Sequence, residues 1–221
     1  MVRQFSVGPI GENVYIVERP GEPVVVVDPG ADADRILSET LEAAERVKNR
    51  AVHMVCTHGH LDHVAAAPGL LAGLRAAGLE ARLFAPAGDR QYFGDTAEAV
   101  NRQVFKDIRA NAFFTRFWTP IPEADVYYDD GYVFPGTGIR AMHTPGHTPG
   151  SSCLLVEGGS ILLAGDTLFR YGRGRTDTFD ADEAAIVSSI RTRILELPDT
   201  VRVMPGHGPS STIGQERPLY P

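Results

Sequence analysis

Short runs of apolar, mostly β-branched residues alternate with longer amphipathic stretches along this chain. The runs at residues 14–17 and 24–27 are separated by a segment that contains Pro and Gly, which predicts a β-hairpin. Residues 34–47 then carry apolar side chains at helical spacing, which predicts an amphipathic helix. A hairpin followed by a helix, and then by further short apolar runs, indicates an α/β protein.

The same reasoning assigns the remaining elements. We predict strands at 52–56, 82–85, 132–134, 139–143, 153–157, 161–164 and 201–204, and helices at 66–77 and 182–197. Residues 88–125 are less regular, but apolar residues recur every four positions from Val100 to Ala112, which predicts an inserted helix followed by a Pro-containing loop. The pattern favours packing of the aromatic residues at 113–118 against the core over a role as the roof of a pocket.

Composition limits the class of protein. The chain has 221 residues, enough for one domain with a substantial core, and 43% of them are hydrophobic. The net charge of −7 argues against a nucleic-acid partner. The apolar runs are too short to cross a membrane, and the first residues lack the apolar segment of a signal peptide. Cys56 and Cys153 lie in apolar runs and are expected to be buried free thiols, so we expect a cytoplasmic protein.

The strongest chemical signal is the segment at residues 57–63, Thr-His-Gly-His-Leu-Asp-His. It follows an apolar run, as a loop at the carboxyl end of a strand does. Its side chains His58, His60, Asp62 and His63 are nitrogen and oxygen ligands of the kind that Zn²⁺ binds. The alternative, a polar helix start with incidental histidines, leaves this density of ligands unexplained. The segment therefore predicts a metal site.

Three later turns also follow predicted strands directly and carry His147, Asp166 and His207. Taken singly, each is more often a structural histidine or a helix N-cap, and His53 and His143, inside predicted strands, are interpreted as structural. However, five of the seven histidines fall in these three turns or in the segment at residues 57–63, which also follows a predicted strand. If the strands share a sheet, the turns meet at one edge and form a single site.

Seven ligands are too many for one tetrahedral zinc and suit two metal ions that share a carboxylate. Two ions about 3.5–4 Å apart can hold a hydroxide between them at neutral pH and polarise the bond under attack. A ligand carboxylate, Asp62 or Asp166, can then move a proton to the leaving group. We therefore predict metal-assisted hydrolysis with two zinc ions per chain, with iron or manganese as alternative metals.

Together these segments resemble the five-part metal signature of the metallo-β-lactamase superfamily, and Asp28 in Val-Asp-Pro-Gly matches its early structural aspartate. The resemblance spans nearly the whole chain. It implies a single-domain αββα sandwich with a helical insertion around residues 88–125 and the metals at one edge of two sheets. It also implies the ligand sets, which are His58, His60 and His147 for metal one, Asp62, His63 and His207 for metal two, and Asp166 as the bridge.

Within the superfamily, residues 165–169 and 174–177 look most like the glyoxalase II group and its small relatives, which hydrolyse S-acyl glutathione thioesters such as S-lactoylglutathione. Arg175 occupies the position of a basic glutathione-binding residue, and Arg170, Tyr171 and Arg173 are further candidates for substrate binding. The other interpretation of these arginines is a solvated loop. Two features depart from the group: Asp177 replaces a tyrosine, and the C-terminal helical domain of the longer enzymes is missing.

Other functions share this signature. A glutathione-dependent persulfide dioxygenase, with one iron, resembles the chain at Arg170 and residues 174–177, but its last histidine lies in Pro-Ala-His-Asp rather than Pro-Gly-His-Gly-Pro. A lactonase or a β-lactamase would use the same ligands, and a non-enzymatic binding protein would be expected to have lost some of them. The sequence therefore favours a hydrolase whose partner is a small-molecule thioester.

Overall fold

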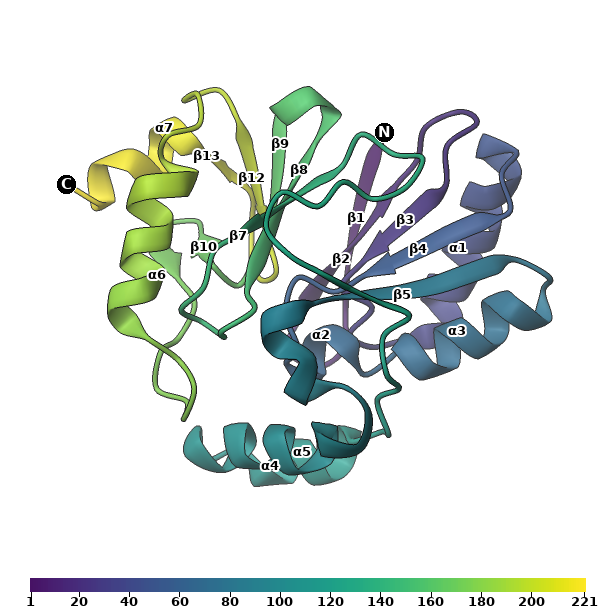
Figure 1. The fold of residues 1–221 in the computed structure, drawn as a ribbon, viewed down its shortest axis with the longest axis horizontal. Helices are drawn as coiled ribbons and strands as arrows, with labels where there is room; N and C mark the ends of the chain where they lie inside the picture. Colours follow the sequence, from purple (N-terminus) through teal and green to yellow (C-terminus); the bar gives the residue numbers. More distant parts are fainter.

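Two β-sheets lie face to face, with helices on their outer sides (Figure 1). The computed structural model describes residues 1–221 except for the side chain of Glu157. The first sheet has the order β1-β2-β3-β4-β5-β6. Its strands are β1 (Val2–Val7), β2 (Glu12–Val17), β3 (Val24–Val27), β4 (Ala51–Val55), β5 (Glu80–Pro86) and β6 (Val126–Tyr128). β1 to β3 pair antiparallel, whereas β3 to β6 pair parallel.

The second sheet has the order β13-β12-β9-β8-β7. Its strands are β7 (Arg140–His143), β8 (Ser152–Val156), β9 (Ile161–Gly165), β12 (Arg202–Pro205) and β13 (Ser211–Thr212). β12 runs parallel to β9, and the other neighbours are antiparallel. A short hairpin of β10 (Leu168–Phe169) and β11 (Gly172–Arg173) follows β9. The two sheets therefore share the mixed topology of an α/β sandwich.

The helices complete the four layers. They are α1 (Ala33–Val47), α2 (Leu61–Val64), α3 (Ala67–Ala76), α4 (Ala97–Asp107), α5 (Asn111–Phe117), α6 (Glu183–Ser189) and α7 (Ile213–Glu216). α1 and α3 cover the first sheet, α6 covers the second, and α4 and α5 form a separate helical lobe below the sheets (Figure 1). No described helix has the length and apolarity needed to cross a membrane.

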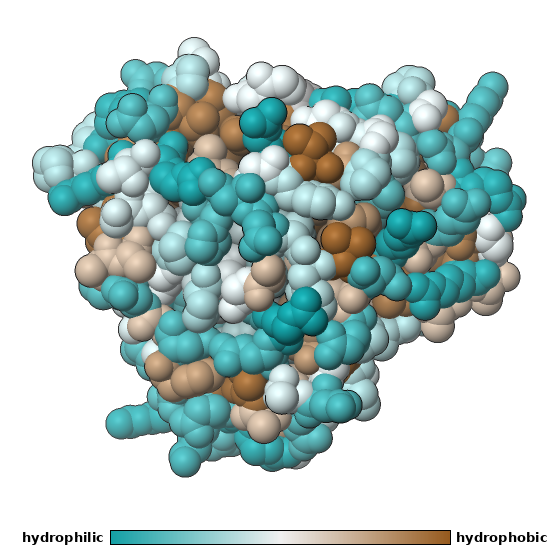
Figure 2. Space-filling view, in the orientation of Figure 1, coloured by the Kyte–Doolittle hydropathy of each residue, from teal (hydrophilic) through white to brown (hydrophobic). Residues whose placement is uncertain are grey.

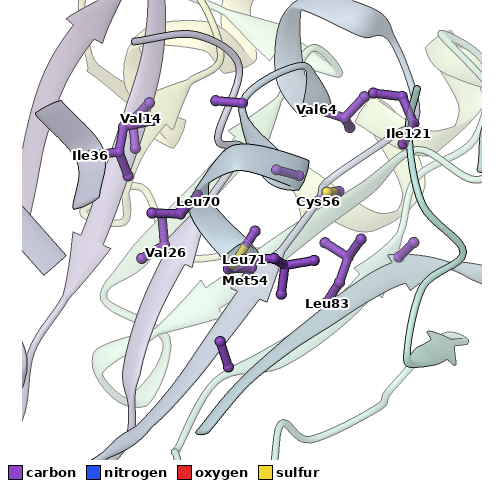
Figure 3. Packing of buried hydrophobic residues seen from close by; sticks show 14 of the residues in the cluster. Val14, Val26, Ile36, Met54, Cys56, Val64, Leu70, Leu71, Leu83 and Ile121 are labelled. Carbon is purple, nitrogen blue, oxygen red and sulfur yellow. The ribbon is translucent and has the colours of Figure 1, made fainter. Parts of the chain in front are cut away.

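The valine run of β3 shows why the chain adopts these layers. Successive side chains of a strand point to opposite faces. Val24 and Val26 accordingly pack toward α1 and α3, in the cluster drawn in Figure 3, whereas Val25 and Val27 pack between the two sheets. Because both faces are buried, the strand carries no polar residue, and each buried valine contributes about 1.5–3 kcal/mol. The predicted αββα architecture is confirmed.

One predicted strand is wrong. Residues 132–134 contain β-favouring aromatic side chains, but in the described backbone Val133 makes only an isolated bridge to Arg140. The sheet is instead extended by β6, Val126–Tyr128. The reason is that the side chain of Phe134 is fully buried between the sheets, where it packs on the rings of Phe84 and Tyr128. Its burial reflects packing and not strand pairing.

Two predicted helices are interrupted. The stripe from Val100 to Ala112 is divided between α4 and α5, because Arg109 adopts a left-handed conformation with φ 58°. The amide of Ala110 then donates to the carbonyl of Phe105, which closes the end of α4. The predicted helix at 182–197 begins as α6 and continues as a π-helical turn at Ile190–Ile194. Neither break contains Gly or Pro, the residues that would have indicated it.

Candidate metal centre

Four strand ends meet at the edge between the two sheets. β4 of the first sheet leads into the segment at residues 57–63, whose last part forms α2. β7, β9 and β12, all in the second sheet, lead to His147, Asp166 and His207. The three later strands share one sheet, as the prediction required, whereas β4 belongs to the other sheet. The seven side chains nevertheless converge, because both sheets present these strand ends at the same edge of the sandwich.

The side chains form two adjacent groups. In the first group the rings of His58, His60 and His147 are stacked edge to face, with centroids 4.5–4.9 Å apart. In the second group Asp62 Oδ2 lies 3.6 Å from His63 Nε2 and 3.2 Å from His207 Nε2. The ligand atoms within each group all lie within 4.8 Å of one another. This is the spacing at which three side chains can surround one ion.

Asp166 lies between the two groups. Its Oδ1 is 3.4 Å from His63 Nε2, and its Oδ2 is 3.7 Å from both His147 Nε2 and His207 Nε2. The backbone leaves room for it only because residue 206 is glycine: a Cβ there would lie 2.2 Å from Asp166 Oδ1. One carboxylate thus reaches histidines of both groups, which is the geometry of a bridging ligand.

Unsatisfied polar atoms test whether these residues fit metal ions. Buried nitrogen atoms without partners cost free energy and are rare in folded proteins. Here, however, several such atoms point into the same small space, namely Nε2 of His58, His60, His63 and His147 and Oδ1 of Asp166. Ions with borderline softness accept this set of imidazole and carboxylate donors. The residues therefore fit one or two divalent metal ions.

The opposite nitrogen of several rings is already engaged. Thr57 Oγ1 donates to Asp28 and accepts from His58 Nδ1 at 3.1 Å, and His147 Nδ1 donates to the carbonyl of Arg175 at 2.9 Å. These bonds place the proton on Nδ1 and leave Nε2 as a lone-pair donor. Such outer partners fix the tautomer and orientation of metal-binding histidines.

The electrostatics favour the protonation states that metal ligands require at His58, His60 and the two carboxylates. At His63 and His207, by contrast, Asp166 and Asp62 outweigh burial and raise the pKa, so that a metal ion would displace a proton there. Burial, reinforced by neighbouring imidazoles, lowers the pKa of His58 well below its usual value and that of His60 to about 3. Burial would raise the pKa of Asp62 and Asp166, but the nearby His63 ring overcomes it and lowers both. The rings of His58 and His60 are thus neutral and the carboxylates ionised near pH 7.

Asp28 holds the opening segment in place. Its carboxylate, only 1% exposed, accepts from the backbone N–H of Thr57 at 2.6 Å, from Thr57 Oγ1 at 2.7 Å and from His63 Nδ1 at 3.1 Å. Asp28 itself has a φ of 54°, a left-handed conformation that Asp tolerates better than most residues. This residue, matched to the family's early aspartate by sequence, therefore orients His63 from behind.

Asp89 is a second buried brace that sequence reasoning missed. It lies in the 3₁₀ turn Ala87–Tyr92 and accepts from Gly59 N–H at 2.9 Å, Thr148 Oγ1 at 2.7 Å and Gly150 N–H at 2.6 Å. It thus joins the loop that carries His58 and His60 to the loop that carries His147. Nothing in the irregular segment around residue 89 indicated this role.

The burial of Asp89 predicts that the stability of the protein depends on pH. Burial raises its pKa to about 7, against an unfolded value near 3.9. Between these values the folded state binds the proton and the unfolded state has lost it, so this contribution to stability falls as pH rises from about 4 to about 7. We expect the wild type to lose unfolding free energy relative to the Asp89→Asn variant as the pH rises over this range. Urea denaturation of the metal-free proteins measures the difference.

The size of this shift tests the burial of the carboxylate. Three pKa units correspond to about 4 kcal/mol, and the pKa of about 7 already includes the opposing effect of the hydrogen bonds that stabilise the ionised form. An Asp95→Asn variant, which alters an exposed carboxylate, is the control and should show no such change. A constant difference between wild type and Asp89→Asn from pH 4 to pH 7 would contradict the raised pKa.

Asn13 and Tyr15 fix the loop of His207 and were also missed. Asn13 Nδ2 donates to the carbonyls of Pro205 and Gly208 at 3.0 and 2.9 Å, and Tyr15 Oη donates to Pro205 at 2.5 Å. The sequence held one signal for this contact, because Glu12 and Asn13 are polar residues directly before an apolar run, and both are buried. Polar residues at such a place need partners.

The predicted substrate-binding residues lie on the segment that follows Asp166. Arg175 is adjacent through its carbonyl, which His147 contacts, but its guanidinium forms two hydrogen bonds with Asp177 at 2.6 and 2.8 Å. Arg173 pairs with Glu183. Arg170 lies over the ring of Tyr171, which is 62% exposed at the tip of the β10–β11 hairpin. The structure thus groups these side chains around one loop, and their role in binding stays a prediction.

The residues interpreted as structural lie outside both groups. His53 Nε2 bonds with the carbonyl of Pro135 and His143 Nε2 with that of Pro149, each at 2.8 Å. Cys56 and Cys153 are buried and not joined to each other, as predicted. The aromatic residues of α5 divide between the two predicted roles, core packing and pocket lining. Phe114 is buried in the core cluster, whereas Phe113 and Phe117 line a cavity.

Known proteins place this arrangement in context. The sequence model described as "Metallo-beta-lactamase superfamily" matches residues 7–207. The hydroxyacylglutathione hydrolase GloC of Haemophilus influenzae is 32% identical over 212 residues, which cover 95% of this chain and 92% of that protein. The first match includes every residue of the two metal-binding groups. The second covers nearly the whole chain that carries them.

Two solved structures share the fold along their whole length. The BLEG-1 B3 metallo-β-lactamase superposes with a TM-score of 0.81 and 28% identity, covering 100% of this chain and 98% of that one. The protein TTHA1623, crystallised in a di-iron-bound form, superposes with a TM-score of 0.75 and 30% identity, covering 99% and 98%. One scaffold thus occurs in proteins named for different activities, and one of them binds two iron ions.

Proposed function

Since the chain belongs to the metallo-β-lactamase superfamily, we propose that it is a metal-dependent hydrolase of thioesters, with acyl-glutathiones such as S-lactoylglutathione as the substrate class. The observation that carries the proposal is the pair of adjacent His/Asp groups whose buried ligand atoms lack hydrogen-bond partners. The similarity to a hydroxyacylglutathione hydrolase over nearly the whole chain supports the choice of substrate.

We propose two zinc ions as the cofactor. His58, His60 and His147 would hold one ion, Asp62, His63 and His207 would hold the other, and Asp166 would contact both. When bound, such ions supply a water-derived nucleophile at neutral pH and polarise the thioester carbonyl. The imidazoles of His58 and His60 are neutral near pH 7, as ligands must be.

The protein's own carboxylates handle the proton. Hydrolysis breaks the C–S bond, adds the oxygen of water to the carbonyl carbon and leaves a thiolate, whose conjugate thiol has a pKa of about 8.5. Asp62 is 3.2 Å from His207 Nε2, and its Oδ2 can accept the proton of the attacking water and pass it to the sulfur. His207 lies beside this path, and its ring, one quarter exposed, is the most accessible of the second group.

The thiol part of the substrate would lie along the β10–β11 hairpin. Arg170, Tyr171, Arg173 and Arg175 are the residues we propose for this contact. A glutathione carboxylate would compete with Asp177 for the guanidinium of Arg175, which suits a carboxylate bidentately. Because that pair is half exposed, it is weak enough to exchange.

Metal dependence is the first test. We expect the zinc-loaded protein to hydrolyse S-lactoylglutathione, a chelator to abolish the reaction, and added metal to restore it, because the nucleophile depends on the ions. The measurement is thioester loss by absorbance, with a penicillin and a simple lactone as comparison substrates, which should react more slowly. Absence of chelator-sensitive thioester cleavage would refute the proposed function.

The persulfide dioxygenase alternative has a distinct outcome. It requires one iron per chain and consumption of oxygen in the presence of glutathione persulfide. Elemental analysis together with an oxygen electrode separates the two reactions on the same preparation. Oxygen uptake by an iron-containing protein that leaves thioesters intact would replace our proposal with this alternative.

A further inference from the structure

A cavity of about 540 Å³ lies beside the second metal group. Asp62 forms part of its lining, together with Glu12, whose carboxylate is buried. Its other walls come from the β1–β2 loop, the start of α1, helix α2 with the two residues after it, and helix α5. Cavities of about 300–1,000 Å³ are the usual size of small-molecule sites. The cavity thus opens directly onto a residue that we assign to the reaction.

The walls of this cavity are mostly apolar. Val7 and Ile10 line it from the β1–β2 loop, Leu61 from α2, and Phe113 and Phe117 from α5. Ile10 is half exposed, so its aliphatic side chain is accessible to a ligand. Figure 2 shows further apolar surface on the helical lobe, where α4 and α5 lie in Figure 1. An apolar wall favours an apolar ligand, not a peptide-like one.

The cavity and the arginine loop contact different ligand residues of the centre. The loop of Arg175 contacts His147, a member of the first group, through a 2.9 Å hydrogen bond. The cavity contacts Asp62, a member of the second group. A thioester with its carbonyl between the two metal-binding groups therefore has two arms to place, one at the arginine loop and one at the cavity. The polar arm, glutathione, suits the arginine loop, and the acyl arm is left for the apolar cavity.

Charge supports the same orientation. Glu12, Asp62 and Asp32 line the cavity, whereas Arg116 is its basic lining residue and packs over the ring of Phe117 at 5.1 Å. The cavity offers a glutathione carboxylate one basic side chain, whereas the arginine loop offers three. A neutral aliphatic chain needs no such partner and gains by leaving water.

We propose that this cavity is the acyl subsite and that the enzyme acts on thioesters of neutral aliphatic acids longer than the three-carbon lactoyl group. The inference rests on the proposed thioester hydrolysis and deepens it. A lactoyl group has five non-hydrogen atoms, and at about 30 Å³ for each water-sized group it fills less than a third of about 540 Å³. A chain of six to eight carbons would contact the aromatic side chains of α5.

The test is a chain-length series. We expect kcat/KM for acetyl-, butyryl-, hexanoyl- and octanoyl-glutathione to rise about tenfold or more for every two methylene groups that reach the cavity. Phe117→Asp should lower the octanoyl-to-acetyl ratio at least about tenfold. Val133→Asp, which changes a half-exposed aliphatic residue outside the cavity lining, is the matched control and should keep the ratio. Ile10→Asp replaces Phe117→Asp if that variant fails to fold.

Two readouts separate this inference from the proposed function. A flat or falling chain-length profile, or an unchanged ratio in both cavity variants, overturns the subsite while thioester hydrolysis stands. If the metal-loaded protein cleaves no thioester, the proposed function fails. Calorimetry with S-octylglutathione and S-methylglutathione then tests whether the cavity binds an alkyl chain. Tighter binding of the octyl compound that is lost in Phe117→Asp supports an apolar subsite, and equal binding overturns it.

Discussion

Replacing Asp166 with asparagine is expected to lower kcat/KM for a thioester by about a thousandfold and to reduce the bound metal from two ions toward one. Asp166 is the carboxylate that reaches both groups, at 3.4 Å from His63 Nε2 and 3.7 Å from His147 Nε2. Asparagine keeps its shape but removes the negative charge. Metal activation accounts for several kcal/mol, and about 4 kcal/mol corresponds to a thousandfold in rate.

The matched control for this substitution is Asp95→Asn, which makes the same chemical change at an exposed site away from the centre. Steady-state kinetics and elemental analysis on both variants are the measurements. Circular dichroism shows whether each variant folds. If Asp166→Asn kept both ions and more than about a tenth of the activity, a bridging role for Asp166 would be excluded.

Replacing Asp28 with alanine is expected to destabilise the metal-free protein by about 3–5 kcal/mol. The change removes a buried carboxylate that accepts three hydrogen bonds, from Thr57 N–H, Thr57 Oγ1 and His63 Nδ1. The donors would be left buried without a partner, at about 1–3 kcal/mol each before the backbone relaxes. Urea denaturation of metal-free wild type and variant measures the loss.

The same residue has a second expected effect, on metal affinity. Because Asp28 orients His63, its loss should weaken zinc binding about 10- to 100-fold, as for other outer partners of metal-binding histidines. Asp28→Asn, which keeps one acceptor oxygen, should lie between wild type and Asp28→Ala in both assays. A stability loss below about 1 kcal/mol together with unchanged zinc affinity would show that Asp28 neither braces the loop nor orients His63.

Much of the fold follows from local patterns. The valine run of β3 predicted a strand, and the structure confirms the strand and shows that both of its faces are buried. The strand-end turns of His58, His147 and His207 were recognisable because a short apolar run stops at a turn in each case. Such signals lie within about ten residues, because the backbone preferences and side-chain periodicity that produce them act between residues close in sequence.

What could not be predicted depends on pairing across the chain. The division of β4 and β9 between two sheets is decided by neighbours far away in sequence, since β4 pairs with β3 and β5, and β9 pairs with β8 and β12. The strand expected at residues 132–134 failed because aromatic side chains favour strands and buried loops alike.

The braces of the centre show the same limit. Asp28 was found because its setting resembles a family motif, whereas Asp89 lies in an irregular segment and acquires its role only when two loops meet around it. A single acidic residue in a loop is ordinarily solvated, so its burial here depends on tertiary contacts. Residues that position a site are therefore harder to find than residues that bind directly.

The position and number of metal ions test the central claim most directly. Anomalous diffraction from crystals of the purified protein, combined with elemental analysis, locates and counts the ions. We predict two ions per chain, one within the group of His58, His60 and His147 and one within the group of Asp62, His63 and His207, with Asp166 between them. Ions at other places, or a protein that binds none when metal is supplied, would contradict this account.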